Sequence, residues 1–204
     1  VMTREEMIAR FSTDHLLRKA SVFDTKKLEW MNGQHLSRLT GHALVAAMTP
    51  SFVAAGLFPD AAAADAAGDW FATVLEDCKE RARTTDQLVE LARPFFPGQP
   101  LMIDPEAAAK HWAEPATAIA WLTAVRAHLA ALTVWTDAGI EADLKALAAE
   151  LGAGVSPLFQ TTRVAVTGRG VGISITKTIF RLGRELALAN IDRALATLAG
   201  TSAA

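Results

Sequence analysis

Helix start and stop signals recur along this chain, and the best candidate for a β-strand, the β-branched run Arg163–Thr167, lies inside a stretch with helical spacing. Thr3 and Glu6 have the spacing of a capping box, and Asp24 precedes apolar residues at helical spacing. Asp104 is followed by Pro105, a pair that favours a helix N-terminus. Ala is frequent, and it loses no side-chain entropy in a helix. The sequence therefore predicts an all-α fold of about ten helices joined by short loops.

Several glycines mark the expected helix ends. Asn32-Gly33 predicts a break or bend in the second helix. Gly152 predicts the end of a helix over residues 137–151, and Gly168 predicts the end of the next one. Gly183 is expected to separate the last two helices.

Composition excludes several classes of protein. About half of the 204 residues are apolar (51%) and the formal net charge is −2, so the chain as a whole is not a general polyanion binder. Cys78 is the only cysteine, which excludes an intramolecular disulfide and a multi-cysteine zinc site. No apolar run is long enough for a membrane span, and the first residues lack a signal-peptide pattern. We therefore expect a cytoplasmic protein.

The most informative local signal is a basic segment without acidic residues. Between Leu151 and Arg184 there is no Asp or Glu, whereas five basic residues fall there: Arg163, Arg169, Lys177, Arg181 and Arg184. The last three are spaced by four and three residues, which predicts one shared helix face. The N-terminus of that helix adds partial positive charge. The segment predicts a polyanion site, and a solvated basic face without a partner remains the alternative.

No pattern in the sequence predicts catalytic residues or a metal site. The five histidines lack metal-binding spacings. The run Gly168-Arg169-Gly170-Val171-Gly172 lacks the third glycine of a dinucleotide fingerprint, because Ile173 occupies that position. It also lacks the Gly-Lys-Ser/Thr ending of a phosphate loop. We interpret it as a turn between helices, and we expect no cofactor in this chain.

Arg81 and Arg83 lie between two predicted helices. Basic residues at a helix C-terminus complement the helix dipole, which would be a purely structural role. A guanidinium can also bond or stack on an unpaired base. Both interpretations remain open from the residues alone.

Three stretches together resemble the C-terminal region of bacterial glutamyl-tRNA synthetases, in the class I aminoacyl-tRNA synthetase family. The first comprises Met7–Phe11, Ser21–Asp24 and Lys27–Gly33, the second is Glu80–Thr84, and the third comprises Arg163–Arg169, Leu182–Glu185 and Arg193–Leu195. Their order and spacing agree with the family over nearly the whole chain. The resemblance implies a stem-contact segment over residues 1–45, followed by two helical anticodon-binding subdomains over 46–114 and 115–204.

The resemblance also implies a partner and a set of contact residues. The partner is a glutamate-accepting tRNA, bound by a monomer whose site lacks metal. Arg81 and the turn residues Gly172, Ile173, Ser174 and Ile175 fall where the family contacts anticodon bases. The tRNA-backbone contacts expected from the basic residues are Arg83, Arg163, Arg169, Lys177, Arg181 and Arg184. The family often has Ser/Thr-Pro in this turn, so the turn here is expected to be less preorganised.

In this family the parent enzyme uses ATP, with Mg, to attach glutamate to its tRNA. The His-Ile-Gly-His-like and Lys-Met-Ser-Lys-Ser motifs of the catalytic domain do not occur in this sequence. We therefore expect anticodon recognition without catalysis from this chain, whether or not glutamine tRNA is also accepted. Two alternatives remain: a free-standing RNA-binding paralogue of this region, and a helical scaffold for protein partners.

Overall fold

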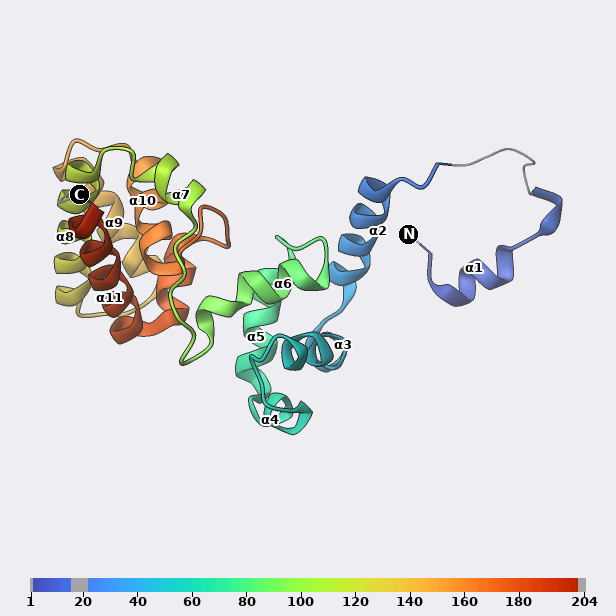
Figure 1. Cartoon of the computed structure of the whole chain (residues 1–204). Coiled ribbons are helices and arrows are strands. Elements are labelled where there is room, and N and C mark those ends of the chain that lie inside the picture. The colour runs from blue at the N-terminus through green and yellow to red at the C-terminus, as the bar shows by residue number, and fades with distance from the viewer. Residues whose placement is uncertain (1, 16–21, 202–204) are drawn as a thin grey trace. The chain divides into compact units, whose positions relative to one another are not determined.

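The computed structural model describes residues 2–15 and 22–201, and the regular secondary structure in that part is entirely helical. Figure 1 shows the order of the elements. They are α1 (Arg4–Arg10), η1 (Thr13–His15), α2 (Thr25–Arg38), α3 (Gly41–Ala54), α4 (Ala61–Ala66), α5 (Gly68–Lys79), α6 (Thr85–Ala92), η2 (Arg93–Phe95), α7 (Pro105–His111), α8 (Pro115–Ala131), α9 (Asp137–Glu150), α10 (Val155–Thr167) and α11 (Ile175–Thr201). The predicted all-α class is confirmed. Ser21, in one of the family-like stretches, lies outside the described residues.

The expected helix starts form the capping bonds that their sequences predict. The Thr3 hydroxyl accepts a hydrogen bond from the Glu6 N–H, and the Glu6 carboxylate accepts one from the Thr3 N–H, which completes the capping box of α1. Asp24 accepts from the Lys27 N–H at 3.0 Å, at the start of α2. Asp104 accepts from the Glu106 N–H at 2.9 Å, at the start of α7. These bonds satisfy backbone donors that have no partner within the helix.

The predicted break at Asn32-Gly33 is wrong, because α2 runs through both residues to Arg38. Gly33 is buried, and a Cβ atom added there would lie 3.0 Å from the Arg83 Cδ. Asn32 donates from its side-chain amide to the Arg83 carbonyl at 2.6 Å. The glycine therefore allows close packing against a distant segment and does not end the helix.

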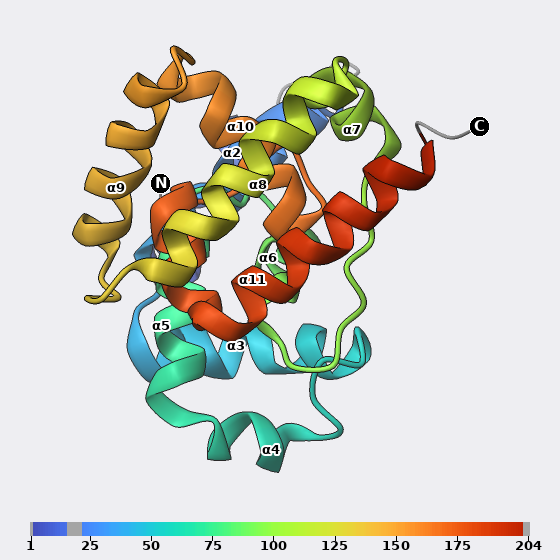
Figure 2. The same cartoon turned by 90° about the vertical axis from the view of Figure 1, so that its left-hand side faces the viewer.

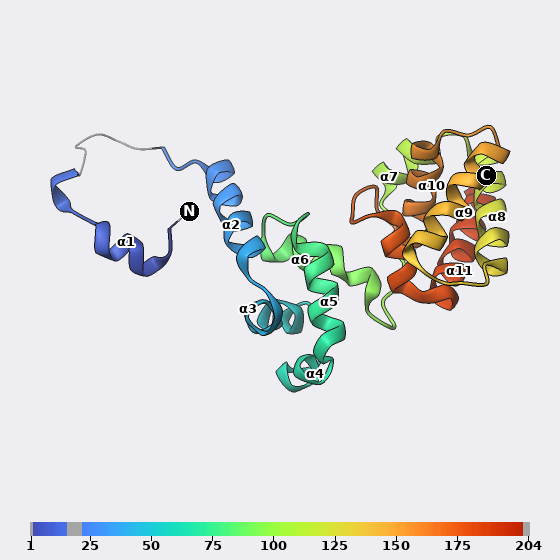
Figure 3. The ribbon, with the colours of Figure 1, turned by 180° about the vertical axis from the view of Figure 1, so that it is seen from behind.

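The first of two compact units extends over Val1–Glu90. In it α3 packs against α4 and α5, and α2 packs against α5 (Figure 3). Phe71 lies edge-on to Phe52 and to Phe58, with ring centroids 4.9 Å apart in both pairs. Cys78 is fully buried beside this core, as expected for a small apolar side chain.

The second compact unit extends over Leu91–Ala204. Helices α8, α9, α10 and α11 pack on one another, and α7 packs on α10 (Figure 2). Leu122, Leu129, Leu144, Leu158 and Ile179 are fully buried among these helices. The predicted stem-contact segment and two anticodon-binding subdomains, with boundaries after residues 45 and 114, remain a prediction. The presence of two compact units does not test it.

Candidate nucleic-acid interface

The turn between α10 and α11 begins at a glycine that no other residue can replace without strain. Gly168 has φ +74°, in the left-handed region, and its N–H donates to the Val164 carbonyl. Its carbonyl accepts from the Asp104 N–H at 2.8 Å, and a Cβ atom at Gly168 would lie 2.0 Å from the Met102 carbonyl oxygen. The backbone of residues 102–104 therefore supports the start of the turn.

The same turn is held from within by Arg163 of α10. Only 9% of Arg163 is exposed, and its guanidinium Nη1 donates to the Ile173 carbonyl at 2.5 Å. A Cβ atom at Gly172 would lie 3.0 Å from that nitrogen, so the glycine lets the backbone pass close to the guanidinium. This placement gives Arg163 a contact within the protein where the sequence predicted one to a tRNA phosphate.

The four turn residues predicted to contact bases differ in exposure: two have buried side chains and two do not. Ile173 is 6% exposed and Ile175 is 2% exposed, so these side chains belong to the core of the second unit. Ser174 is exposed, and its carbonyl accepts from the Thr178 N–H at 2.8 Å in the first turn of α11. Gly172 is half-buried and has no side chain. A ligand at this turn would therefore meet backbone groups and the Ser174 hydroxyl.

Three of the predicted basic residues remain at the surface near this turn. Arg169 lies in the turn itself, and Lys177 and Arg181 lie in the first turns of α11; all three are half-buried. The Arg181 guanidinium carbon lies 5.5 Å from the centroid of the Phe180 ring. Their positive charges therefore lie in and beside the turn, as expected from the basic segment without acidic residues.

Arg184 does not share the face of Lys177 and Arg181, which corrects the expectation from their spacing. Gly183, with φ +76° and ψ 162°, interrupts the helical backbone of α11 just before it. The Arg184 guanidinium donates to the carbonyls of Ala130 and Leu132 and lies 5.0 Å from the centroid of the Trp135 ring. It therefore caps the C-terminal end of α8.

In the first unit, Arg81 and Arg83 follow the end of α5 and are both exposed. The Arg81 N–H donates to the Cys78 carbonyl at 3.0 Å, which closes the last turn. The Arg83 side chain lies over Gly33, and the Arg83 N–H donates to the Gln87 side chain at 2.8 Å. Gln87 in turn donates from its N–H to the Thr84 hydroxyl, so the short segment between α5 and α6 is well fixed.

A hollow of about 250 Å³ lies beside the start of the α10–α11 turn. Its lining comes from α7 and from the turn: Asp104, Glu106, Ala107, Lys110, His111, Arg169, Gly170 and Val171. Burial lowers the pKa of His111, and the positive charges of Lys110 and Arg163 lower it further, which favours the neutral imidazole. No sequence pattern places Lys110 and His111 at this turn, because only folding brings α7 beside it.

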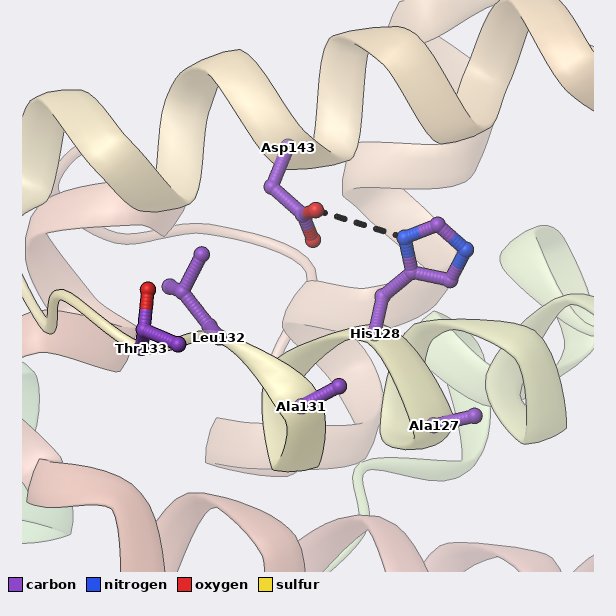
Figure 4. Close-up of a pocket in the computed structure, with 6 residues that line it drawn as sticks. All are labelled: Ala127, His128, Ala131, Leu132, Thr133 and Asp143. Atoms are coloured by element: carbon purple, nitrogen blue, oxygen red, sulfur yellow. Dashed lines mark hydrogen bonds and ion pairs between the residues drawn. The ribbon is translucent and has the colours of Figure 1, made fainter.

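A second hollow, of about 360 Å³, lies between the end of α8 and α9 (Figure 4). His128 Nδ1 lies 3.3 Å from one carboxylate oxygen of Asp143, and the other oxygen is buried without a hydrogen-bond partner. No Lys or Arg lines this hollow, and a carboxylate does, so its chemistry does not suit a polyanion.

In residues 2–15 and 22–201, no group of three His, Cys, Asp or Glu side chains is placed to hold a metal ion. No helix in those same ranges has the length and apolar character needed to cross a membrane.

Comparison with known proteins gives a consistent result. The sequence model of the anticodon binding domain family matches residues 43–195. The chain is 34% identical, over its whole length, to the glutamate–tRNA ligase of Roseiflexus castenholzii, of which it spans 40%. It is 32% identical to glutamate–tRNA ligase 1 of Acidithiobacillus ferrooxidans, with 96% of this chain and 41% of that protein covered.

Solved structures show the same fold. The chain superimposes on a glutamate–tRNA ligase from Elizabethkingia meningosepticum with a TM-score of 0.68 and 22% identity, covering 95% of this chain and 36% of that one. For the enzyme from Elizabethkingia anophelis the TM-score is 0.65, with 19% identity. The chain thus spans about 40% of the length of the curated relatives it matches. The resemblance to the C-terminal region of glutamyl-tRNA synthetases is confirmed, and the chain belongs to the anticodon binding domain family.

Proposed function

We propose that this chain binds the anticodon region of a glutamate-accepting tRNA. The observation that carries the proposal is the α10–α11 turn. Its backbone is held by Asp104 and Arg163, and it lies among the basic residues Arg169, Lys177 and Arg181. Anticodon bases are unpaired and can be splayed out, and a fixed backbone with positive charge beside it suits them.

Base contacts are assigned to both units. In the first unit, the exposed Arg81 guanidinium has five N–H donors in a planar fork that can bond one base edge at two points. In the second unit, the exposed Ser174 hydroxyl and the backbone of Gly172 to Ile175 supply donors and acceptors. Contacts to base edges are the ones that distinguish one sequence from another.

Phosphate contacts are assigned to Arg83, Arg169, Lys177 and Arg181. Such contacts orient an RNA without reading its sequence. Arg163 and Arg184 are left out of this set, because the guanidinium of each donates to backbone carbonyls of the protein.

We also propose that the parent protein is a glutamate–tRNA ligase that attaches glutamate to its tRNA with ATP and Mg. The relatives that span this chain carry that name and are about two and a half times as long, as the 40% coverage indicates. In the parent, the function of this region would be to select the tRNA.

The test is a titration of this chain with glutamate tRNA and with the same tRNA carrying a swapped anticodon, at low and moderate salt. We expect tighter binding to the glutamate anticodon at both salt concentrations. Equal, salt-sensitive binding would instead favour a relaxed RNA-binding paralogue. No binding at either concentration would favour a helical scaffold for protein partners.

A further inference from the structure

A break at Gly183 divides α11 into two halves, residues 175–182 and 184–201. The Gly183 backbone has φ +76° and ψ 162°, a conformation that only glycine adopts readily. Apart from its chain neighbours, nothing lies within 4 Å of the Cβ position of Gly183, so no contact of the glycine itself sets the angle between the halves. That angle matters for the proposed interface, because the first half carries Lys177 and Arg181.

After the break, Arg184 ties the second half of α11 to α8. Its guanidinium donates to the Ala130 carbonyl at 2.8 Å and to the Leu132 carbonyl, both at the end of α8. Helices α8 and α11 pack against each other (Figure 2). A guanidinium presents its donors in a rigid fork, so two acceptors fix its orientation more closely than one would. The first residue after the break is therefore attached to the end of another helix.

Before the break, Trp135 holds the first half of α11. Its indole Nε1 donates to the Phe180 carbonyl at 3.4 Å. The last four carbonyls of a helix lack partners within it, and Phe180 is among these four for a half that ends at Leu182. The centroid of the Trp135 ring also lies 5.0 Å from the Arg184 guanidinium carbon. One side chain thus contacts both sides of the break.

We propose that Trp135 and Arg184 form a latch that positions the basic first half of α11 against the RNA backbone. The inference rests on the proposed function and extends it, since neither latch residue touches the RNA. The capping is reciprocal: Arg184 caps the end of α8, and Trp135, in the loop that follows α8, caps the first half of α11. Without the latch, buried side chains such as Ile179 would still hold the first half to the core, but its angle to the second half would change.

The test compares Trp135→Phe with Trp112→Phe as its matched control. Both substitutions keep an aromatic ring and remove one indole donor, because the Trp112 Nε1 donates to the Thr161 carbonyl at 3.2 Å. Neither substitution changes the charge of the chain, so a change in salt dependence cannot come from a lost cation. We expect Trp135→Phe to lower the slope of log Kd against log salt by about 0.7, as for one lost phosphate contact with a single strand. Trp112→Phe should leave the slope unchanged.

Arg184→Lys and Arg126→Gln form a second pair. Lysine keeps the charge of Arg184 but lacks the fork that bonds two carbonyls, so Arg184→Lys should lower the slope as Trp135→Phe does. Arg126 also joins α8 to α11, since its guanidinium donates to the Asp192 carboxylate at 2.9 Å in the second half. Arg126→Gln therefore removes a cation and a bond between the same two helices, away from the latch. It should leave the slope unchanged.

The anticodon preference separates the latch from the base contacts. It should persist in both latch variants, because Asp104 and Arg163 hold the α10–α11 turn independently. A reduced preference with an unchanged slope would place the effect in the base contacts, which overturns the inference. An unchanged slope in both latch variants overturns it too. An equal drop in slope for the two controls would reduce the latch to a general contributor to stability, with the same consequence.

Amide hydrogen exchange of the free chain tests the structural step by itself. We expect both latch variants to speed exchange over residues 177–183, and the two controls not to do so. Unchanged exchange there would overturn the inference even if RNA binding fell. If the native chain binds no tRNA, the proposed function fails and the positioning role fails with it, whereas the exchange data still decide whether Trp135 and Arg184 hold the break.

Discussion

Gly168 shows how a single residue can decide whether the proposed interface forms. Its φ of +74° already disfavours any side chain, and a Cβ atom would lie 2.0 Å from the Met102 carbonyl oxygen. We expect Gly168→Ala to lower the free energy of unfolding by about 3 kcal/mol or more, since left-handed strain of about 1–2 kcal/mol adds to a backbone clash. Urea denaturation followed by circular dichroism measures this loss.

Gly152 provides the control for that substitution. It has a similar φ of +60°, but nothing lies within 4 Å of the Cβ position. Gly152→Ala should therefore cost only the conformational strain, about 1–2 kcal/mol. If both alanine variants lost the same free energy of unfolding, the clash of the added Cβ atom with residues 102–104 would have no measurable cost.

Arg81 is the residue whose proposed role is the most specific. Arg81→Ala should reduce the preference for the glutamate anticodon by about 1–3 kcal/mol, the range for one bidentate contact with a base. Because the side chain is exposed, the free energy of unfolding should change by less than about 0.5 kcal/mol. Titration with tRNAs that differ at one anticodon position measures the preference.

Arg83→Ala is the matched comparison, two residues along the same segment. It should weaken binding to all tested tRNAs alike, because a phosphate contact carries no sequence information. It should also lower stability slightly, since the Arg83 side chain covers Gly33. An anticodon preference that survives Arg81→Ala intact would remove Arg81 from the base-contact set.

At the scale of the element, the first half of α11 carries the charge that is proposed to hold the RNA backbone. Arg181→Ala should weaken binding to every tRNA and lower the slope of log Kd against log salt by about 0.7, as for one phosphate contact with a single strand. Lys145→Ala is the control, because Lys145 is an exposed cation of α9 paired with Glu141 at 2.6 Å, away from the turn. The same drop in slope for both variants would indicate general electrostatic attraction.

Element boundaries were predictable from sequence where their cause is local. The capping bonds of Thr3 with Glu6 and of Asp24 with Lys27 join residues three apart, so short-range patterns contain all the information needed. The same holds for the left-handed Gly168, which ends α10. The break expected at Asn32-Gly33 failed because the partner of these residues, Arg83, is 51 residues from Asn32.

The candidate site was predictable only in part, for the same reason. Charge segregation located the basic segment, and the family resemblance located the turn. Neither indicated that Arg163 is buried or that Arg184 bonds to carbonyls more than fifty residues away, at Ala130 and Leu132. Arginines that bind phosphate and arginines that bind backbone carbonyls have the same sequence pattern, and only packing separates them.

At the scale of the whole molecule, each compact unit contains a core of its own. The buried side chains of α8 to α11, among them Leu122, Leu144 and Leu158, find their partners within Leu91–Ala204. A span of roughly 110 residues is enough for an independent hydrophobic core. We therefore expect residues 91–204, produced alone, to unfold cooperatively in urea, with the circular dichroism of a helical protein.

The isolated second unit also allows the base contacts proposed for the α10–α11 turn to be measured without the one proposed for Arg81. It keeps the α10–α11 turn with Arg169, Lys177 and Arg181 but lacks Arg83, so its slope of log Kd against log salt should be lower than that of the full chain by about 0.7, as for one lost phosphate contact. It lacks Arg81, so it should no longer distinguish tRNAs that differ only at the base assigned to Arg81. A non-cooperative transition would show that the second unit depends on residues 1–90 for its fold. If the isolated unit keeps the full anticodon preference, Arg81 contributes no base contact.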